Sequence, residues 1–131
     1  MNTRKQLVLV IAVILILDFS AIFLSSTTGR IVSSEENPFT VSEVFDKVIL
    51  EEDVFVKGEV TNILEDHVSS KGFSYQQFMI SDGEEEIKVF CSVKYGRTKV
   101  KEGDQIIFDG EFKKYYGTYE IYGFCSEIRI L

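Results

Sequence analysis

The sequence predicts one small all-β domain, a closed five-stranded Greek-key barrel, preceded by a short amphipathic helix and an N-terminal transmembrane helix. From Val54 onward, apolar residues recur with a period of two, and turn signals follow one another at intervals of about ten residues. Glycines inside the first, fourth and fifth expected strands indicate a strongly curved sheet that closes on itself. At 131 residues, the chain has room for one such domain and a short appendage.

The apolar stretch from Leu7 to Leu24 predicts the transmembrane helix. As a helix its eighteen residues span about 27 Å, close to the roughly 30 Å of a bilayer's hydrocarbon core. Asp18 lies within the stretch, and a carboxylate at that depth costs about 2.5–3.5 kcal/mol. A cleaved signal peptide, with Leu7–Leu17 as its apolar core, is the alternative. In both cases the basic residues Arg4 and Lys5 predict a cytoplasmic N-terminus and an extracytoplasmic domain, and the anchor predicts a single-pass membrane protein.

Composition divides the chain into three segments. Residues 1–24 are expected to form the cytoplasmic stub and transmembrane helix, or the signal peptide. Residues 25–38 are small, polar or charged and predict a linker. Residues 39–131 are expected to form the folded domain, which begins with a short helix capped by Thr40 or Ser42. The apolar residues of this helix recur at spacings of three and four: Val41, Val44, Phe45, Val48 and Ile49.

Five strands are expected after the helix. The run Asp82–Glu86 lacks the alternating ligand spacing of a calcium loop and is interpreted as a solvated, acidic hairpin turn between the second and third strands. The expected strands are Val54–Leu64, Phe73–Ser81, Ile87–Val93, Gln105–Tyr115 and Thr118–Leu131.

Short motifs occur along these strands in a fixed order: VKGEV at 56–60, FMISDG at 78–83, IKVF at 87–90, KEGD at 101–104 and FDGEF at 108–112. Their order resembles an OB-fold domain, especially the nucleic-acid-binding type found in archaeal and tRNA-anticodon-binding proteins. The resemblance covers about residues 40–131 and implies single-stranded nucleic acid as the ligand. The link between the third and fourth strands lacks the apolar helix of many family members. We therefore expect Phe39–Leu50 to plug the barrel in its place.

Strand alternation gives the candidate binding face. If Phe78 and Ile80 point into the barrel, alternate residues of the second and third strands face outward. OB-fold domains stack bases on aromatic rings on this face, over a cationic track, and the loop between the fourth and fifth strands closes over the ligand. Arg97 and Lys99 are expected to flank that loop. The alternative is that the outer rings pack under the helix or linker. The candidate ligand-binding residues are Tyr75, Met79, Lys88, Phe90, Lys113, Lys114, Tyr115 and Tyr116.

The net charge of the domain argues against a polyanionic ligand that is held by electrostatic attraction alone. Residues 31–131 hold eleven Lys and Arg and twenty Asp and Glu, a net charge of −9. Such a field repels phosphate backbones at long range, so nucleic-acid binding needs a local patch. The alternative function is therefore an extracytoplasmic module that uses the same face to bind a protein, a glycan, another envelope component or a small ligand.

The cysteines and the histidine carry no catalytic or metal-binding pattern. Cys91 and Cys125 fall on neighbouring strands and form either a disulfide outside the cytoplasm or two small buried thiols. With His67, which is interpreted as a solvated loop residue, they are too few for the usual four-ligand zinc site. One histidine leaves no Ser-His-Asp triad, and the sequence has no phosphate-binding loop. We expect a binding protein rather than an enzyme, with no cofactor and no metal.

Overall fold

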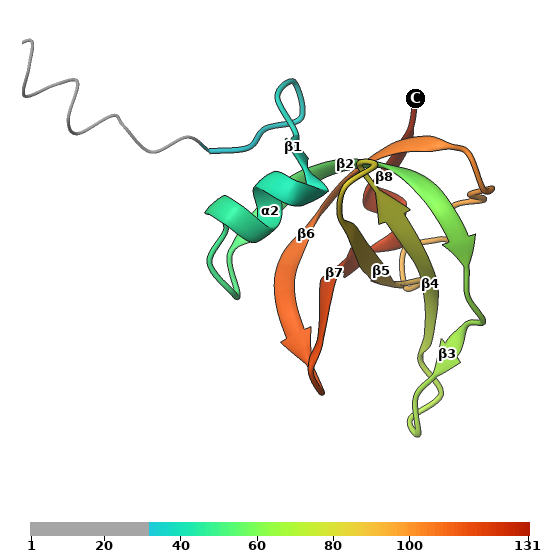
Figure 1. Ribbon diagram of the computed structural model, residues 1–131. Helices are drawn as coiled ribbons and strands as arrows, with labels where there is room; N and C mark the ends of the chain where they lie inside the picture. Colours follow the sequence, from blue (N-terminus) through green and yellow to red (C-terminus); the bar gives the residue numbers. More distant parts are fainter. Residues whose placement is uncertain (1–31) are drawn as a thin grey trace, which may run out of the picture. The chain divides into compact units, whose positions relative to one another are not determined.

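The computed structural model describes residues 32–131, of which Ser33–Leu131 form one compact unit (Figure 1). No helix within this described part is both long and apolar enough to cross a membrane. The predicted transmembrane segment Leu7–Leu24 lies outside the described residues, as does the linker up to residue 31.

Five strands form a closed barrel, as the sequence predicted. The strand order is β2-β4-β5-β7-β6, and pairing between β6 and β2 closes the sheet. Strands β5 and β7 are parallel, and the other neighbours in the barrel are antiparallel. The barrel strands are β2 (Asp53–Ile63), β4 (Ser74–Ser81), β5 (Glu86–Ser92), β6 (Gln105–Tyr115) and β7 (Thr118–Phe124).

Shorter elements extend the barrel at its edges. They are β1 (Phe39–Thr40), α2 (Val41–Lys47), β3 (His67–Val68), the 3-10 helix η1 (Cys125–Glu127) and β8 (Ile128–Ile130). The expected final strand Thr118–Leu131 is therefore two strands. The η1 turn separates them, so that β7 pairs with the last part of β6 and β8 pairs with its first part.

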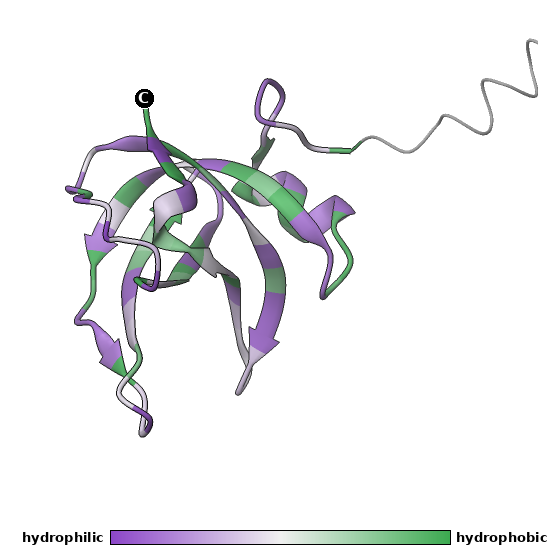
Figure 2. Ribbon diagram, turned by 180° about the vertical axis from the view of Figure 1, so that it is seen from behind, coloured by the Kyte–Doolittle hydropathy of each residue, from purple (hydrophilic) through white to green (hydrophobic). Residues whose placement is uncertain are grey.

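The core follows the predicted alternation. Phe78 and Ile80 of β4 are buried, as are the three residues of β5 expected to point inward, Ile87, Val89 and Cys91. The neighbouring residues of both strands are more exposed, and Figure 2 shows hydrophobic and hydrophilic bands alternating along the curved strands. The two sides of the sheet are therefore clearly distinguished, and the register of β4 with β5 fixes which side chains lie on the outer face.

Helix α2 plugs the barrel, as expected for the segment Phe39–Leu50. Thr40 caps the helix: its hydroxyl accepts a hydrogen bond from the backbone N–H of Glu43, whose carboxylate accepts one from the N–H of Thr40. Val41 and Val44 are fully buried in the core. Residues 93–104 contain no helix, in agreement with the departure from the OB-fold pattern noted in the sequence.

Asp82 ties this helix to the β4–β5 hairpin. Its carboxylate accepts hydrogen bonds from the backbone N–H groups of Glu84 (2.9 Å) and Glu85 (2.8 Å) in the turn, and from that of Ser42 (2.8 Å) in α2. Burial alone raises its pKa, but the bonds from Glu85 and Ser42 outweigh burial and hold the pKa of Asp82 well below its ordinary value. The acidic run is thus more than the solvated turn expected from sequence.

We expect Asp82→Ala to lower the free energy of unfolding by about 1–3 kcal/mol, because three backbone donors lose a charged acceptor. Since the pKa of Asp82 is depressed in the folded state, its contribution is complete above its ordinary value of 3.8 and is lost as the pH falls below that value. Urea titrations of the full-length protein at neutral and acidic pH measure both effects. Glu84→Ala, which removes a charge from the same exposed turn, is the control, and equal midpoints for the two variants would contradict the assignment.

Candidate ligand-binding groove

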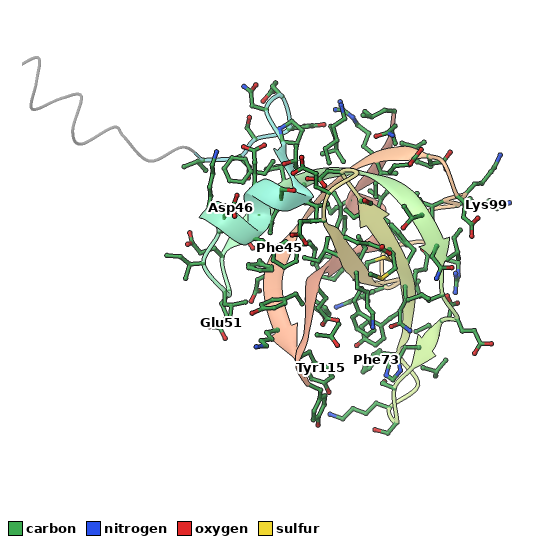
Figure 3. All side chains as sticks on the ribbon, in the orientation of Figure 1. Phe45, Asp46, Glu51, Phe73, Lys99 and Tyr115 are labelled. Carbon is green, nitrogen blue, oxygen red and sulfur yellow. A yellow bond between two sulfur atoms is a disulfide. The ribbon has the colours of Figure 1, made fainter. Side chains whose placement is uncertain are left out.

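A groove lies on the outer face of the barrel between two hairpins. In Figure 1 the β3–β4 and β6–β7 hairpins project from the same end of the barrel, and Figure 3 shows Phe73 beside one hairpin and Tyr115 on the other. The hollow has a volume of about 510 Å³. This outer groove is lined by His67, Ser69, Tyr75, Gln77, Lys88, Phe90, Lys113, Tyr115, Glu120 and Tyr122.

Three aromatic rings stand side by side in the outer groove, one from each of three neighbouring strands. Tyr75 of β4 and Phe90 of β5 stack with ring centroids 4.7 Å apart and planes inclined by 17°. Tyr122 of β7 is directly opposite Phe90 in the register, with centroids 6.1 Å apart and planes inclined by 25°. We call these three residues the aromatic row. The ring of His67 also borders this row, because its centroid lies 5.8 Å from that of Phe90 and 6.0 Å from that of Tyr75.

A second row of side chains crosses the same face, two residues along the strands from the aromatic row. Glu120 of β7 is paired with Lys88 of β5 on one side and with Lys113 of β6 on the other. We call Lys88, Glu120 and Lys113 the charged row. Because residues two apart on a strand share a face, the charged row lies beside the aromatic row. The Nζ of Lys113 stands 4.9 Å from the ring centroid of Tyr122, which is a cation–π contact.

Glu120 is the buried member of the charged row, with only 6% of its surface exposed. Burial raises its pKa, and the charges of Lys88 and Lys113 act in the opposite direction. Lys113 also forms an ion pair with a second carboxylate, because its Nζ lies 3.8 Å from Oε1 of Glu111. The charged row therefore combines two cations with an acidic residue whose side chain is largely covered by its neighbours.

The β6–β7 hairpin carries two adjacent tyrosines at its tip. Tyr116 and Gly117 form a two-residue turn, and both have positive φ angles, of 48° and 81°. This is the conformation of a type I′ turn, which glycine adopts readily and tyrosine rarely. Tyr116 is 91% exposed, and its ring centroid lies 4.4 Å from that of Tyr115. The turn thus holds one aromatic ring in solvent at the rim of the outer groove.

The structure brings five of the eight candidate residues together in the outer groove. The other three lie elsewhere. Met79 is paired with Lys88 but does not line the groove, Tyr116 is at the hairpin tip, and Lys114 points to the opposite face. There its Nζ stands 5.0 Å from the ring centroid of Tyr119, beside α2. The five groove residues are Tyr75, Lys88, Phe90, Lys113 and Tyr115.

Arg97 and Lys99 do not flank the β6–β7 hairpin, contrary to the prediction. They line a separate hollow of about 320 Å³, where Arg97 forms an ion pair with Asp66. Figure 3 shows Lys99 far from Tyr115. The reason is the loop 93–104, which is fixed on the other side of the barrel by a 2.7 Å hydrogen bond from the Thr98 hydroxyl to the carbonyl of Cys125.

Sequence reasoning missed Glu120, Tyr122 and His67. The first two had a detectable signal: a two-residue turn at Tyr116 and Gly117 aligns β7 with β6 and places both residues on the face of Lys113. His67 had no such signal. It reaches the rings of the groove because the short strand β3 pairs with β4, and no local sequence pattern predicts this pairing.

Cys91 and Cys125 form a disulfide, the first of the two alternatives left open by the sequence. Their Cα atoms are 5.0 Å apart, and both residues are fully buried (Figure 3). The bond joins Cys91, the residue of β5 that follows Phe90, to Cys125 at the start of η1. Elsewhere in residues 32–131, no group of three or more His, Cys, Asp or Glu side chains is arranged to hold a metal ion.

Comparison with known proteins identifies the fold. No protein-family model and no curated protein matches the chain. Among solved structures, a domain of replication protein A from Methanococcus maripaludis matches with a TM-score of 0.55 and 18% identity, over 66% of this chain and 91% of that one. The hypothetical protein ygiW from E. coli matches with a TM-score of 0.55 and 18% identity, over 77% and 97%. At such identities the likeness concerns the fold, which is an OB-type barrel.

Proposed function

We propose that this OB-type barrel is a binding module for single-stranded nucleic acid, which it holds in the outer groove. The observation that carries the proposal is the aromatic row, three rings on adjacent strands of the face that OB-fold domains use for oligonucleotides. Base stacking on such rings contributes about 1–3 kcal/mol per base and tolerates any sequence. Lys88 and Lys113 stand beside the rings, where a phosphate of the strand would lie.

Electrostatics make this a weak and moderately salt-dependent binder. The domain as a whole carries a net charge of −9, and two lysines line the outer groove. Each phosphate contact with a single strand contributes about −0.7 to the slope of log K against log salt, so one or two contacts by these lysines give a slope between about −0.7 and −1.4. Stacking, which is insensitive to salt, supplies the larger part of the binding free energy.

We further propose that Leu7–Leu24 anchors the protein in a membrane and that the barrel lies outside the cytoplasm. The disulfide between Cys91 and Cys125 supports this, because such bonds persist in oxidising compartments. The same disulfide and the acidic charge favour a second candidate function, in which the outer groove binds a glycan or a protein of the envelope. OB-fold faces bind oligosaccharides as well as oligonucleotides.

Removal of two rings tests the first function. We expect Tyr75→Ala plus Phe90→Ala to weaken binding of a labelled oligonucleotide by at least about thirtyfold, because each lost stacking contact costs about 1–3 kcal/mol. The measurement is fluorescence anisotropy of the full-length protein in mild detergent, at several salt concentrations.

The control is a second pair of contacting aromatic residues that lies outside the outer groove. Tyr95 and Phe124 are exposed and stack edge to face, with ring centroids 4.9 Å apart. Tyr95→Ala plus Phe124→Ala should leave the affinity within about twofold of the original. If the unaltered protein shows no binding at about 100 µM, the weak limit of non-specific nucleic-acid binding, the first function is wrong and the second becomes the working hypothesis.

A further inference from the structure

The carboxylate of Glu120 has no role in base stacking. Within residues 32–131, its oxygens accept no side-chain hydrogen bond and form no ion pair within 4.0 Å, although two lysines flank it. It lines the outer groove with only 6% of its surface exposed. Within the described residues, the only fully buried side-chain oxygen or nitrogen without a partner is the Oγ of Ser42, so the Glu120 oxygens still reach solvent at the groove. The groove therefore presents two acceptor oxygens that a ligand can satisfy.

The charged row fixes the pattern of donors and acceptors around these oxygens. Neighbouring strands lie about 4.8 Å apart, so the side chains of Lys88 and Lys113 lie on either side of Glu120. An ammonium group only donates hydrogen bonds, and an ionised carboxylate only accepts them. Read across the sheet, the floor of the groove offers a donor, two acceptors and another donor.

Guanine is the base whose Watson–Crick edge complements this pattern. Its O6 accepts, and its N1–H and N2–H₂ groups both donate in the same direction, so that a carboxylate can accept from the two together. Adenine and cytosine each place a ring nitrogen acceptor next to their amino group. Thymine and uracil set one N–H between two carbonyl oxygens. In each of these bases an acceptor would face a carboxylate oxygen.

We infer that the outer groove prefers a guanine within the bound strand, with Glu120 accepting from N1 and N2 and one flanking lysine donating to O6. The other lysine is then left to contact a phosphate. The guanine ring then extends toward the aromatic row, which lies about 7 Å away along the strands. This inference rests on the proposed function and adds a specificity-determining residue to it.

The test uses the full-length protein and labelled oligothymidylates of about eight nucleotides, a length within the site size of one OB fold. One central thymidine is replaced in turn by guanosine, adenosine and cytidine. Because a good bidentate contact discriminates against a mismatched base, we expect the strand with guanosine to bind about tenfold more tightly than the other three. Glu120→Gln, which exchanges one acceptor for a donor, should bring all four affinities to within about twofold of each other.

Glu111→Gln is the matched control. It removes a carboxylate of the neighbouring strand β6 that also lies beside Lys113 but does not line the outer groove. It should keep the preference for guanosine. Equal affinities of the unaltered protein for all four strands, or a preference that survives Glu120→Gln, would overturn the inference and leave the proposed function standing. Absence of binding to every strand would overturn both.

Discussion

Replacement of Gly110 by alanine is expected to destabilise the protein by about 3 kcal/mol or more, because the core has no space for one additional methyl group at this position. A Cβ atom on Gly110 would lie 2.7 Å from Cγ2 of Ile121 and 2.8 Å from the backbone oxygen of Tyr122. The second contact is with backbone, so it cannot be relieved by a change of rotamer. Strands β6 and β7 would have to move apart where they pair.

The other close glycines of the strands provide a graded comparison. A Cβ atom on Gly123 would lie 2.9 Å from Cζ of Phe108, and one on Gly58 would lie 3.1 Å from Cβ of Ile80. The loss of unfolding free energy should therefore decrease in the order Gly110→Ala, Gly123→Ala, Gly58→Ala. Urea unfolding followed by circular dichroism measures the three values. If Gly110→Ala proves the least destabilising of the three, the close packing of β6 against β7 is not what excludes a side chain at Gly110.

Loss of the disulfide is expected to cost about 2–4 kcal/mol. Cys91 and Cys125 are separated by 34 residues, and closing a loop of that length removes conformational entropy from the unfolded chain. For a domain of this size, the loss corresponds to a fall in Tm of about 10–25 °C. The folded barrel should persist in the variant, because its core consists of many other buried apolar residues.

The measurement compares thermal unfolding with and without a reductant. The unaltered protein should lose stability when reduced, and Cys91→Ala plus Cys125→Ala should unfold near the reduced protein and be insensitive to the reductant. The double alanine variant also leaves a small cavity at each site, which adds to its loss. Identical unfolding of the oxidised and reduced protein would contradict the expected contribution.

The barrel was predictable because its signal is periodic. Alternation of apolar residues from Val54 onward gave the strands, and the fixed side-chain period of a strand then placed Phe90 and Lys88 outside and Val89 inside. Helix α2 was predictable from its cap and its apolar spacing. The final strand was the exception: Cys125–Glu127 form a 3-10 turn that no run of Gly or Pro residues marks.

The candidate site was only partly predictable because it depends on register between strands. Tyr75, Phe90 and Lys88 follow from alternation within single strands. The position of Glu120 between two lysines depends on a parallel pairing with β5 and an antiparallel pairing with β6, which are properties of the closed barrel. Lys114 shows the converse error, since a sequence neighbour of Lys113 necessarily points to the other face of β6.

The disulfide also closes a covalent ring within the chain, and the outer groove takes residues from inside and from outside this ring. The chain between Cys91 and Cys125 becomes a closed ring, and this ring contains Lys113 and Glu120, whereas Tyr75 and Phe90 belong to the chain before it. The exposed loop 93–104 within the ring carries four basic residues, the sites that trypsin recognises. A protease that cut this loop would leave a single molecule with both halves of its groove still attached. A cut in this loop would therefore not separate the barrel into two fragments.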